Sequence, residues 1–246
     1  MNTESRKTQK MTEGGEILAK IMQRLLDKVR PGVDTLSLDL LAEELCRENN
    51  VIPAFKGYQD FPATICVGPN DVVVHGIPDD IALRRGDIVS VDMGIIYKGY
   101  YLDMARTVGV GEISPEKCEF IDITRRALEF ACIAAVTGNT VGDIGHAIES
   151  TVTKHGYSVV REMVGHGVGK KLHEPPQIPG YGIPGEGDRL QAGQTIAIEA
   201  IINEGDPAIV ISAKDGWTAR TKDGKLSALF ENTVLVSEEA VVLTPL

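Results

Sequence analysis

The stretch DIVSVDMGIIYKGYYLDMART, residues 87–107, decides the fold, because it reads as a β-hairpin that carries carboxylates in apolar surroundings. Two runs rich in Val, Ile, Tyr and Met, at 88–97 and 100–110, flank the turn-forming pair Lys98-Gly99. A two-residue loop of this kind fixes which residues of the two strands face each other. We therefore expect a hairpin whose register can be stated from the sequence.

The expected register places two acids on the same face of the sheet. With this loop, Gly94 pairs with Asp103 and Asp92 pairs with Ala105. Asp92 and Asp103 are then diagonal neighbours, about 7 to 8 Å apart at Cα. A buried pair of unpartnered carboxylates is costly, and a cation between them would resolve the cost. A register one residue off would instead send the two side chains to opposite faces as ordinary acids, and the hairpin alone leaves both interpretations open.

The composition indicates a globular chain with a real core, made of one large domain or two small ones. The chain has 246 residues, of which 43% are hydrophobic. No apolar run approaches the ~18 residues that a membrane helix needs. The first ten residues, MNTESRKTQK, lack the apolar core of a secretory signal. We therefore expect a cytoplasmic protein that does not enter a membrane.

The net charge and the spacing of the cysteines argue against a nucleic-acid-binding surface, a zinc cluster and a disulfide framework. The net charge is −10 and no run or stripe of Lys and Arg is present, so we expect no direct nucleic-acid partner. Four cysteines, Cys46, Cys66, Cys118 and Cys132, are scattered without a CxxC pair. This spacing predicts free thiols rather than a zinc cluster or a disulfide framework.

Along the chain, two helices followed by strands occur twice. Periodicity and caps predict helices at 4–29, 37–50, 114–138 and 143–154, and strands or extended pieces at 51–78, 88–110, 194–203, 208–212 and 226–236. The two parts also share short matches, such as HGI at 75–77 and HGV at 166–168. This repeat suggests two similar halves, about 1–112 and 113–246, that face each other across a site.

Two glutamates stand in apolar, strand-like segments of the second half. Glu199 lies in TIAIEAIIN and Glu231 lies in SALFENTVLV. Strands this apolar are buried on both faces, so a glutamate within them needs a partner. That partner is either a metal ion or, as the plainer alternative, an arginine or a backbone amide.

Two histidines follow in glycine- and proline-rich sequence. His166 lies in GHGVG, and His173 precedes EPP. The glycines and prolines exclude the helical HExxH pattern of zinc proteases, while a glycine-flanked histidine can approach a ligand closely. Each could also be an ordinary loop histidine. The remaining pair, His146 and His155, falls on a predicted helix and is expected to be structural or solvated.

Taken in order, these residues resemble the five-ligand dinuclear metal site of the methionine aminopeptidases. The five are Asp92, Asp103, His166, Glu199 and Glu231. The surrounding segments are similar to that family's motifs in order and spacing: VVVHGIP, VDMGIIYKGYYLDMART, GHGVGKKLHEPP, TIAIEAIIN and KDGWTARTKDGKLSALFENTVLV. The resemblance covers nearly the whole chain. Because no long N-terminal extension precedes the motifs, the chain resembles the short bacterial type, type I.

The resemblance implies an α+β protein with the pita-bread fold of the creatinases and aminopeptidases. That fold has two pseudo-symmetric halves and a curved antiparallel sheet flanked by helices, here as a single catalytic domain over 1–246. The resemblance further implies a monomer that removes the N-terminal methionine of nascent polypeptides, at the ribosome.

The same resemblance assigns the metal ligands. Asp92 would bind one metal ion bidentately. Asp103 and Glu231 would bridge two ions. His166 and Glu199 would complete the second site. An oxygen-dominated shell with one imidazole and no thiolate suits two divalent ions of Mn, Fe or Co, with Zn as a further candidate.

Catalytic roles also follow from the resemblance. His173 would stabilise the developing oxyanion, His75 would hydrogen-bond the scissile amide, and Glu199 would carry a proton between water and the leaving amine. Two metal ions that share a water lower its pKa and polarise a carbonyl. The substrate's free amino group would bind a metal, which restricts cleavage to the first residue.

An apolar pocket would select methionine. Beside the two catalytic histidines, His75 and His173, its expected members are Tyr58, Phe61, Cys66 and Trp217. Trp217 is the only tryptophan and could instead be a core or surface aromatic.

Three positions depart from the family pattern: Phe55 replaces a frequent Cys, Leu172 replaces a frequent aromatic, and Ala200 replaces a frequent Pro. Phe55 and Leu172 leave the shape of the pocket open. None of the three is a metal ligand.

Three alternatives remain at this level. A proline-specific peptidase of the same fold usually carries a further N-terminal domain, for which this chain has no room. A metal-free binding module of the same fold would have lost ligands that this chain keeps. A cytosolic α/β protein with unrelated buried acids would require several independent coincidences.

Overall fold

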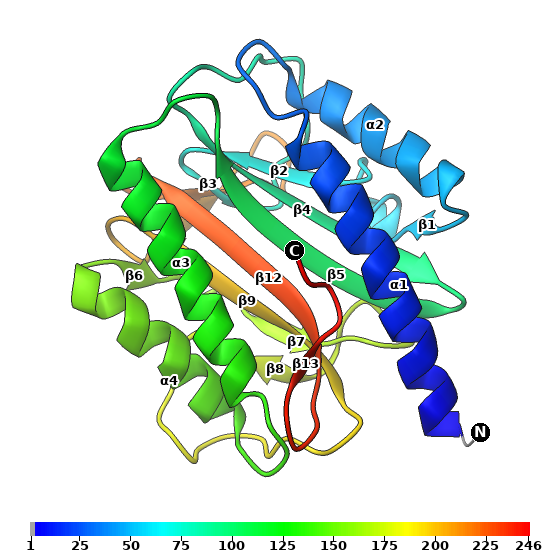
Figure 1. Ribbon diagram of the computed structural model, residues 1–246. Coiled ribbons are helices and arrows are strands. Elements are labelled where there is room, and N and C mark those ends of the chain that lie inside the picture. Colours follow the sequence, from blue (N-terminus) through cyan, green and yellow to red (C-terminus); the bar gives the residue numbers. More distant parts are fainter. Residues whose placement is uncertain (1–2) are drawn as a thin grey trace.

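The computed structural model describes residues 3–246 and has two layers, a curved antiparallel sheet and four helices that cover one of its faces (Figure 1). The helices are α1 (Thr3–Leu26), α2 (Thr35–Glu48), α3 (Pro115–Ala134) and α4 (Val141–Val152). Single 3-10 turns occur at Tyr58–Asp60 and Thr153–His155. This architecture confirms the expected α+β class. Within the described residues, no helix combines the length and apolarity needed to cross a membrane.

The main sheet has ten strands, and its central path runs β1-β4-β5-β12-β9-β7-β8. In chain order the ten are β1 (Ile52–Pro53), β2 (Cys66–Pro69), β4 (Ile88–Tyr97), β5 (Tyr100–Gly109), β6 (Ser158–Val159), β7 (Gly165–Gly167), β8 (Glu174–Ile178), β9 (Thr195–Asn203), β12 (Ser227–Leu235) and β13 (Val241–Val242). A smaller sheet of three strands holds β3 (Val72–Val74), β10 (Ile209–Ile211) and β11 (Ala219–Thr221).

The register that the sequence predicts for the hairpin is confirmed. β4 pairs with β5 so that Gly94 faces Asp103 and Asp92 faces Ala105. The loop residues 98–99 have φ of 47° and 78°, the left-handed conformation that the tightest hairpin turns require at both positions. Because directly paired residues share a face, Asp92 and Asp103 lie on the same side of the sheet.

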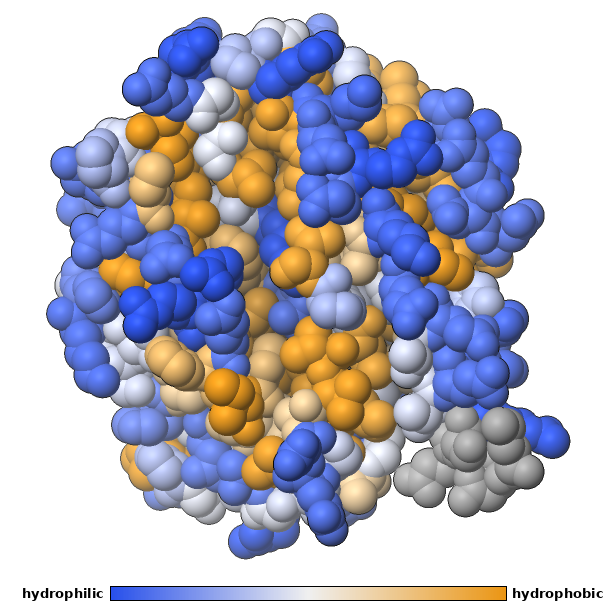
Figure 2. Space-filling view, in the orientation of Figure 1, coloured by the Kyte–Doolittle hydropathy of each residue, from blue (hydrophilic) through white to orange (hydrophobic). Residues whose placement is uncertain are grey.

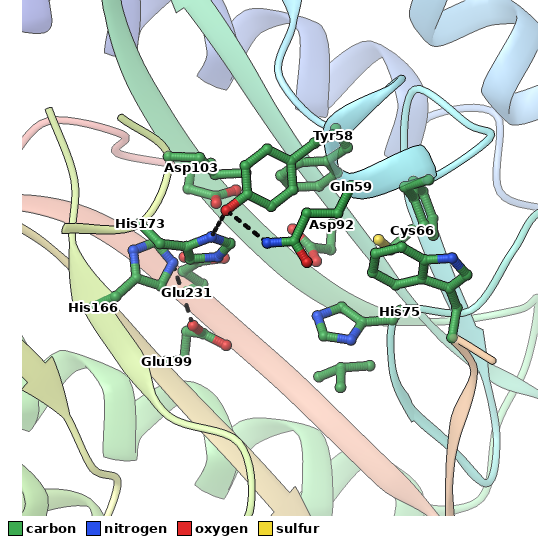
Figure 3. A pocket seen from close by; sticks show the side chains of 15 residues that line it. Tyr58, Gln59, Cys66, His75, Asp92, Asp103, His166, His173, Glu199 and Glu231 are labelled. Carbon is green, nitrogen blue, oxygen red and sulfur yellow. Dashed lines mark hydrogen bonds and ion pairs between the residues drawn. The ribbon is translucent and has the colours of Figure 1, made fainter. Parts of the chain in front are cut away.

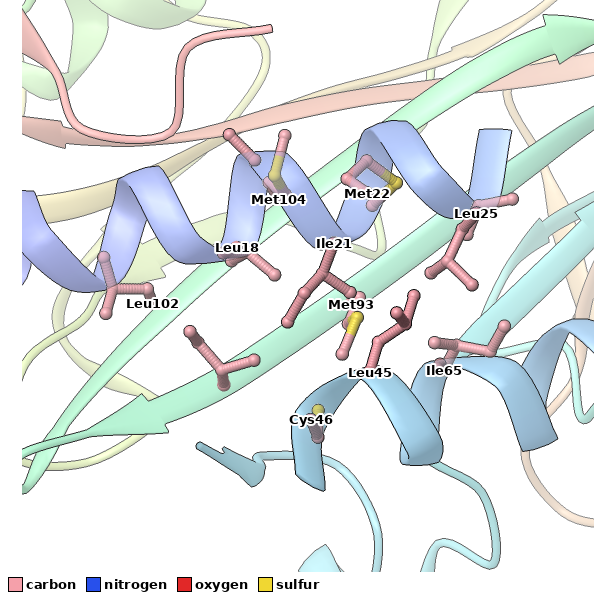
Figure 4. Close-up of a cluster of buried hydrophobic side chains, with 14 of the residues drawn as sticks. Leu18, Ile21, Met22, Leu25, Leu45, Cys46, Ile65, Met93, Leu102 and Met104 are labelled. Atoms are coloured by element: carbon pink, nitrogen blue, oxygen red, sulfur yellow. The ribbon is translucent and has the colours of Figure 1, made fainter. Parts of the chain in front are cut away.

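Successive side chains of these strands point to opposite faces of the sheet, so core residues lie on one face and site residues on the other. Met93 and Met104 belong to the buried cluster beneath α1 and α2 (Figure 4). Their strand neighbours Asp92 and Asp103 point to the opposite face. On β9, residues of the core beneath α3 and α4 flank Glu199 in the same way. The helices therefore shield one face and leave the other face free.

The helices begin where local caps predict or slightly earlier. Ser114 accepts a hydrogen bond from the amide of Lys117 and caps α3, as expected. α4 begins at Val141 rather than 143, because Asp143 accepts hydrogen bonds from both the amide and the hydroxyl of Thr140 at 2.7 and 2.8 Å.

On the helical face, a shallow apolar groove lies between α1 and α3 (Figure 2). Leu26, Ile121, Phe230 and Val242 are among the residues that line it. Phe230 alternates with Glu231 along β12, so this groove is separated from the carboxylates by the sheet itself.

α1 approaches the end of the chain closely because of one glycine. A Cβ added to Gly15 would lie 1.8 Å from the main-chain oxygen of Leu243. A Cβ on the adjacent Gly14 would instead meet side-chain atoms, Leu102 Cδ1 at 2.6 Å and Tyr97 Cβ at 3.0 Å. The helix therefore rests directly on the main chain at Gly15.

We predict that Gly15→Ala lowers the free energy of unfolding. Alanine favours a helix by about 1 kcal/mol over glycine, but the new methyl group cannot fit against Leu243 without moving α1. Urea unfolding followed by circular dichroism should show a lower midpoint. Gly14→Ala, whose methyl group meets movable side chains, should lose less. A Gly15→Ala protein as stable as the parent would refute the close contact.

Candidate metal centre

A cavity of about 180 Å³ opens on the face of the sheet that the helices leave free (Figure 3). Every residue that the sequence singles out for the site lines it: Tyr58, Phe61, Cys66, His75, Asp92, Asp103, His166, His173, Glu199, Trp217 and Glu231. The structure thus brings together side chains from both parts of the chain. Their roles stay predictions.

Four adjacent strands deliver the carboxylates. β12 lies between β5 and β9, and Glu231 of β12 pairs with Ala105 on one side and with Glu199 on the other. His166 of β7 pairs with Ala197 of β9. Paired residues and residues two apart share a face, so the acids and His166 converge on one point.

The carboxylates are crowded and lack partners. One oxygen each of Asp92, Asp103 and Glu231 is buried without a hydrogen-bond partner among residues 3–246. Burial raises the pKa of Asp92 to about 7 and, together with the charge of Asp92, raises the pKa of Glu199 to about 8. Burial and neighbouring acids raise the pKa values of Asp103 and Glu231 well above their ordinary range. A cation among the four groups would favour their ionised forms and lower these pKa values.

The donor set fits divalent metal ions. Ligand atoms of Asp103, His166 and Glu231 lie within 4.8 Å of one another. Glu199 Oε1 lies 3.8 Å from His166 Nε2. His166 Nδ1 donates to the carbonyl oxygen of Gly167 at 2.9 Å, so Nε2 keeps its lone pair toward the carboxylates. Carboxylates with one imidazole suit Mn, Fe, Co or Zn.

The thiol of Cys66 lines the same cavity but is poorly suited to join these ligands. Burial and the nearby acids raise its pKa well above the ordinary value, so it stays protonated.

Behind the carboxylates, on the helical face of the sheet, lies a buried guanidinium. Arg106 donates to the main-chain oxygens of Glu231 at 2.6 Å, Ala105 at 2.8 Å and Thr244 at 3.2 Å. It also donates to Asn232 Oδ1 at 2.7 Å. Burial lowers the pKa of Arg106 to about 10, which still leaves it protonated at neutral pH. The hydrogen bonds hold β5 and β12 together at the level of Glu231.

Aromatic rings form one wall of the cavity. Trp217 meets Phe61 edge to face, with ring centroids 5.1 Å apart, and meets His75 in the same manner at 6.1 Å. His75 has a φ of 57°, a conformation that non-glycine residues rarely adopt outside functional sites. Burial lowers the pKa of His75, so its imidazole is neutral at pH 7.

The remaining lining residues include two that the sequence analysis missed, Gln59 and Val74. Gln59 lies in a polar loop and carries no pattern that marks it. Val74 directly precedes His75 in the VVVH run, the one signal that could have found it. Phe55 and Leu172, noted as departures, line the cavity as well, whereas Ala200 is buried in the core beneath α3 and α4.

Comparison with known proteins gives a consistent result. A sequence profile of metallopeptidase family M24 matches residues 9–238. The methionine aminopeptidase of Clostridium perfringens is 44% identical over 226 residues, which make up 92% of this chain and 90% of that protein. The crystal structure of methionine aminopeptidase from Rickettsia prowazekii superposes with a TM-score of 0.96 at 38% identity, covering 98% of both chains.

A proline-specific relative fits less well. The prolidase from Pyrococcus furiosus superposes with a TM-score of 0.79 at 25% identity, and the match covers 98% of this chain but 64% of the prolidase. The pita-bread fold expected from the sequence is confirmed by these structural neighbours.

Removing one carboxylate should weaken metal binding without preventing the protein from folding. We predict that Asp103→Asn makes the metal-free protein more stable, because a neutral amide relieves the repulsion among buried acids. In the parent, a metal ion at 100 times its Kd should add about 2.7 kcal/mol, or roughly 5 to 10 °C in Tm. Asp103→Asn should lose most of this metal-induced increase in Tm.

Thermal unfolding with and without added Mn, Co or Zn measures both effects. Asp122→Asn, an exposed acid on α3 that pairs with Arg125, serves as the matched control and should keep the metal-induced shift. Equal metal-induced shifts in the parent and Asp103→Asn would contradict the proposed ligand set.

Proposed function

This chain belongs to metallopeptidase family M24, and we propose which of its residues carry out the removal of N-terminal methionine that defines the methionine aminopeptidases within that family. The observation that carries the proposal is the convergence of four buried carboxylates and His166 in one cavity, with three carboxylate oxygens lacking partners among the described residues. Cations between the carboxylates would let all four ionise without the cost of burying unpaired like charges.

We assign five residues to hold two divalent metal ions. They are Asp92, Asp103, His166, Glu199 and Glu231. When bound, such ions would lower the pKa of the attacking water toward neutrality and polarise the carbonyl of the scissile peptide bond. The charge of four carboxylates offsets that of two divalent cations. Mn, Fe, Co and Zn all suit this donor set.

The chain's own side chains position and protonate the substrate. Glu199 takes a proton from the attacking water and passes it to the leaving amine. His173, at the mouth of the cavity, donates a hydrogen bond to the developing oxyanion. His75, neutral in its partly buried position beside Trp217, forms a hydrogen bond with the scissile amide.

The aromatic wall supplies specificity for the first residue. Tyr58, Phe61, Cys66 and Trp217 surround a space in which a flexible thioether side chain packs well. A sulfur atom near aromatic rings adds a favourable contact. Phe55 and Leu172 shape the same pocket and set how closely methionine fits.

The alternatives receive less support. A metal-free binding module would have no need of unpartnered buried carboxylates, and all five ligand positions are retained. A proline-specific peptidase would be expected to match prolidases at least as well as methionine aminopeptidases, and the reverse holds.

We further propose that the substrates are the N-termini of nascent polypeptides, met at the ribosome in the cytoplasm. We also propose that the protein acts as a monomer. The two parts of the chain, about 1–112 and 113–246, would act as similar halves of a single domain: β4 and β5 bring Asp92 and Asp103, and the second half brings the other three ligands.

Release of free methionine tests the proposed function. Metal-stripped protein should be inactive on a short Met-Ala peptide, and added Mn, Fe, Co or Zn should restore activity. Asp103→Asn should remain inactive with every metal. The corresponding Leu-Ala peptide should be cleaved more slowly. Folded, metal-loaded protein that releases no methionine, or that prefers leucine, would refute the proposal.

The pocket assignment has its own test. Trp217→Ala should reduce kcat/KM for the Met-Ala peptide roughly 10- to 100-fold, the usual effect of lost apolar contacts in a specificity pocket. Phe130→Ala, which removes an exposed aromatic ring from α3, should change nothing. An unaltered kcat/KM in Trp217→Ala would place the tryptophan outside the pocket.

A further inference from the structure

Two neighbouring histidines in the cavity are held through the same ring nitrogen by chemically different partners. The rings of His166 and His173 lie with centroids 4.3 Å apart. His166 Nδ1 lies 2.9 Å from the carbonyl oxygen of Gly167, and His173 Nδ1 lies 2.8 Å from the hydroxyl of Tyr58 (Figure 3). In each histidine, Nε2 therefore remains available to a metal ion or a substrate in the cavity.

The nature of each partner decides where the proton sits. A carbonyl oxygen can only accept, so the proton of neutral His166 is on Nδ1 and its Nε2 is a lone-pair donor to metal. A hydroxyl group can either donate or accept. The tautomer of His173 consequently depends on the direction in which the hydroxyl of Tyr58 points.

Gln59 is the second hydrogen-bond partner of that hydroxyl. Its Nε2 donates to the hydroxyl oxygen of Tyr58 at 3.3 Å. The amide takes one of the two lone pairs of the hydroxyl oxygen, and His173 Nδ1 is the acceptor within hydrogen-bond distance to which the hydroxyl proton can point. His173 then carries its own proton on Nε2, where it can be donated.

We propose that Gln59 and Tyr58 form a hydrogen-bond relay that holds His173 in the Nε2-protonated tautomer, opposite to that of His166. The proposal rests on the proposed function in one respect: an Nε2 proton is what His173 needs in order to donate to the oxyanion. Tyr58 and Gln59 are then positioning residues that act through His173. Tyr58 has this role in addition to lining the methionine pocket.

The loop that carries Tyr58 and Gln59 has an unusual backbone conformation. Gln59 and Asp60 have φ of 48° and 67°, and Gly57 has a φ of 85°. Two consecutive non-glycine residues in the left-handed region cost free energy. The turn is closed by a hydrogen bond from the amide of Gly57 to the carbonyl of Phe61 at 2.8 Å. It lets Gln59 reach back to its neighbour Tyr58 while Phe61 packs on Trp217.

The alternative is an amide of Gln59 turned the other way. Its oxygen would then accept the hydroxyl proton of Tyr58, the hydroxyl would accept from His173 Nδ1, and Nε2 would lose its proton. Gln59→Glu imposes this reversed direction, because a carboxylate only accepts. The variant has nearly the same shape as the parent and therefore tests the direction of the relay rather than its presence.

The experiment is long-range ¹H–¹⁵N correlation NMR on protein labelled with ¹⁵N-histidine, both metal-free and zinc-loaded, at pH 8. The chain has five histidines, and the spectrum of His173→Gln identifies the signals of His173. The parent should show His173 protonated at Nε2 and His166 protonated at Nδ1. Gln59→Glu should shift His173 to the Nδ1-protonated form, and Tyr58→Phe should give a mixture of the two tautomers.

Kinetics on the Met-Ala peptide provide the second readout. Gln59→Glu should lower kcat roughly 100-fold, comparable to the loss of one oxyanion donor, with little change in KM. Tyr97→Phe, which removes a distant hydroxyl bonded to Glu13, is the matched control and should change neither the tautomers nor kcat. An unaltered His166 signal in each variant shows that the site remains folded.

The outcomes separate the relay from the proposed function. If the parent shows His173 protonated at Nδ1, or if Gln59→Glu leaves its tautomer unchanged, the relay is wrong even where methionine is released. If the tautomers respond as expected but the parent releases no methionine, the relay stands and the proposed function fails. A change in tautomer without any change in kcat would overturn the link between the relay and the oxyanion.

Discussion

The structure depends on one constraint, the crowding of like-charged carboxylates in a site that is shielded from water. Four carboxylates lie on one face of one sheet, and burial alone makes their simultaneous ionisation costly. The other face of the sheet packs against two apolar cores, one beneath α1 and α2 and one beneath α3 and α4, and Arg106 holds the main chain of Glu231 from that side. The proposed metal ions would offset this negative charge, and the proposed catalysis would depend on them.

The sequence predicted those parts of the site that local rules decide. The two-residue loop at 98–99 fixed the hairpin register, so Asp92 and Asp103 could be placed on one face from the sequence alone. The pairing of Glu231 with Glu199 could not be placed this way, because β9 and β12 are joined by a long connection and many registers satisfy the same apolar pattern. Those residues were found through motif order.

Other features had no signature in the sequence at all. Gln59 reaches the cavity because a non-glycine residue adopts a left-handed φ, which composition and periodicity do not reveal. The start of α4 at Val141 was set by hydrogen bonds from Thr140 to Asp143, a local cap that apolar periodicity places only approximately. In both cases the deciding factor is the geometry of a few polar groups rather than the distribution of hydrophobic residues.

The pairing of β5 with β12 has a kinetic consequence. Arg106 and the carbonyl of Glu231, which join these strands, are 125 positions apart in the chain. Pairings between such distant segments form slowly, because closing the long loop costs conformational entropy before the stabilising contacts form. The proposed metal ligands thus lie on strands that only long-range pairing brings together, unlike the short, local ligand spacing of a zinc finger. Metal ions that bind the folded site would shift the equilibrium toward the native state in proportion to their affinity for it.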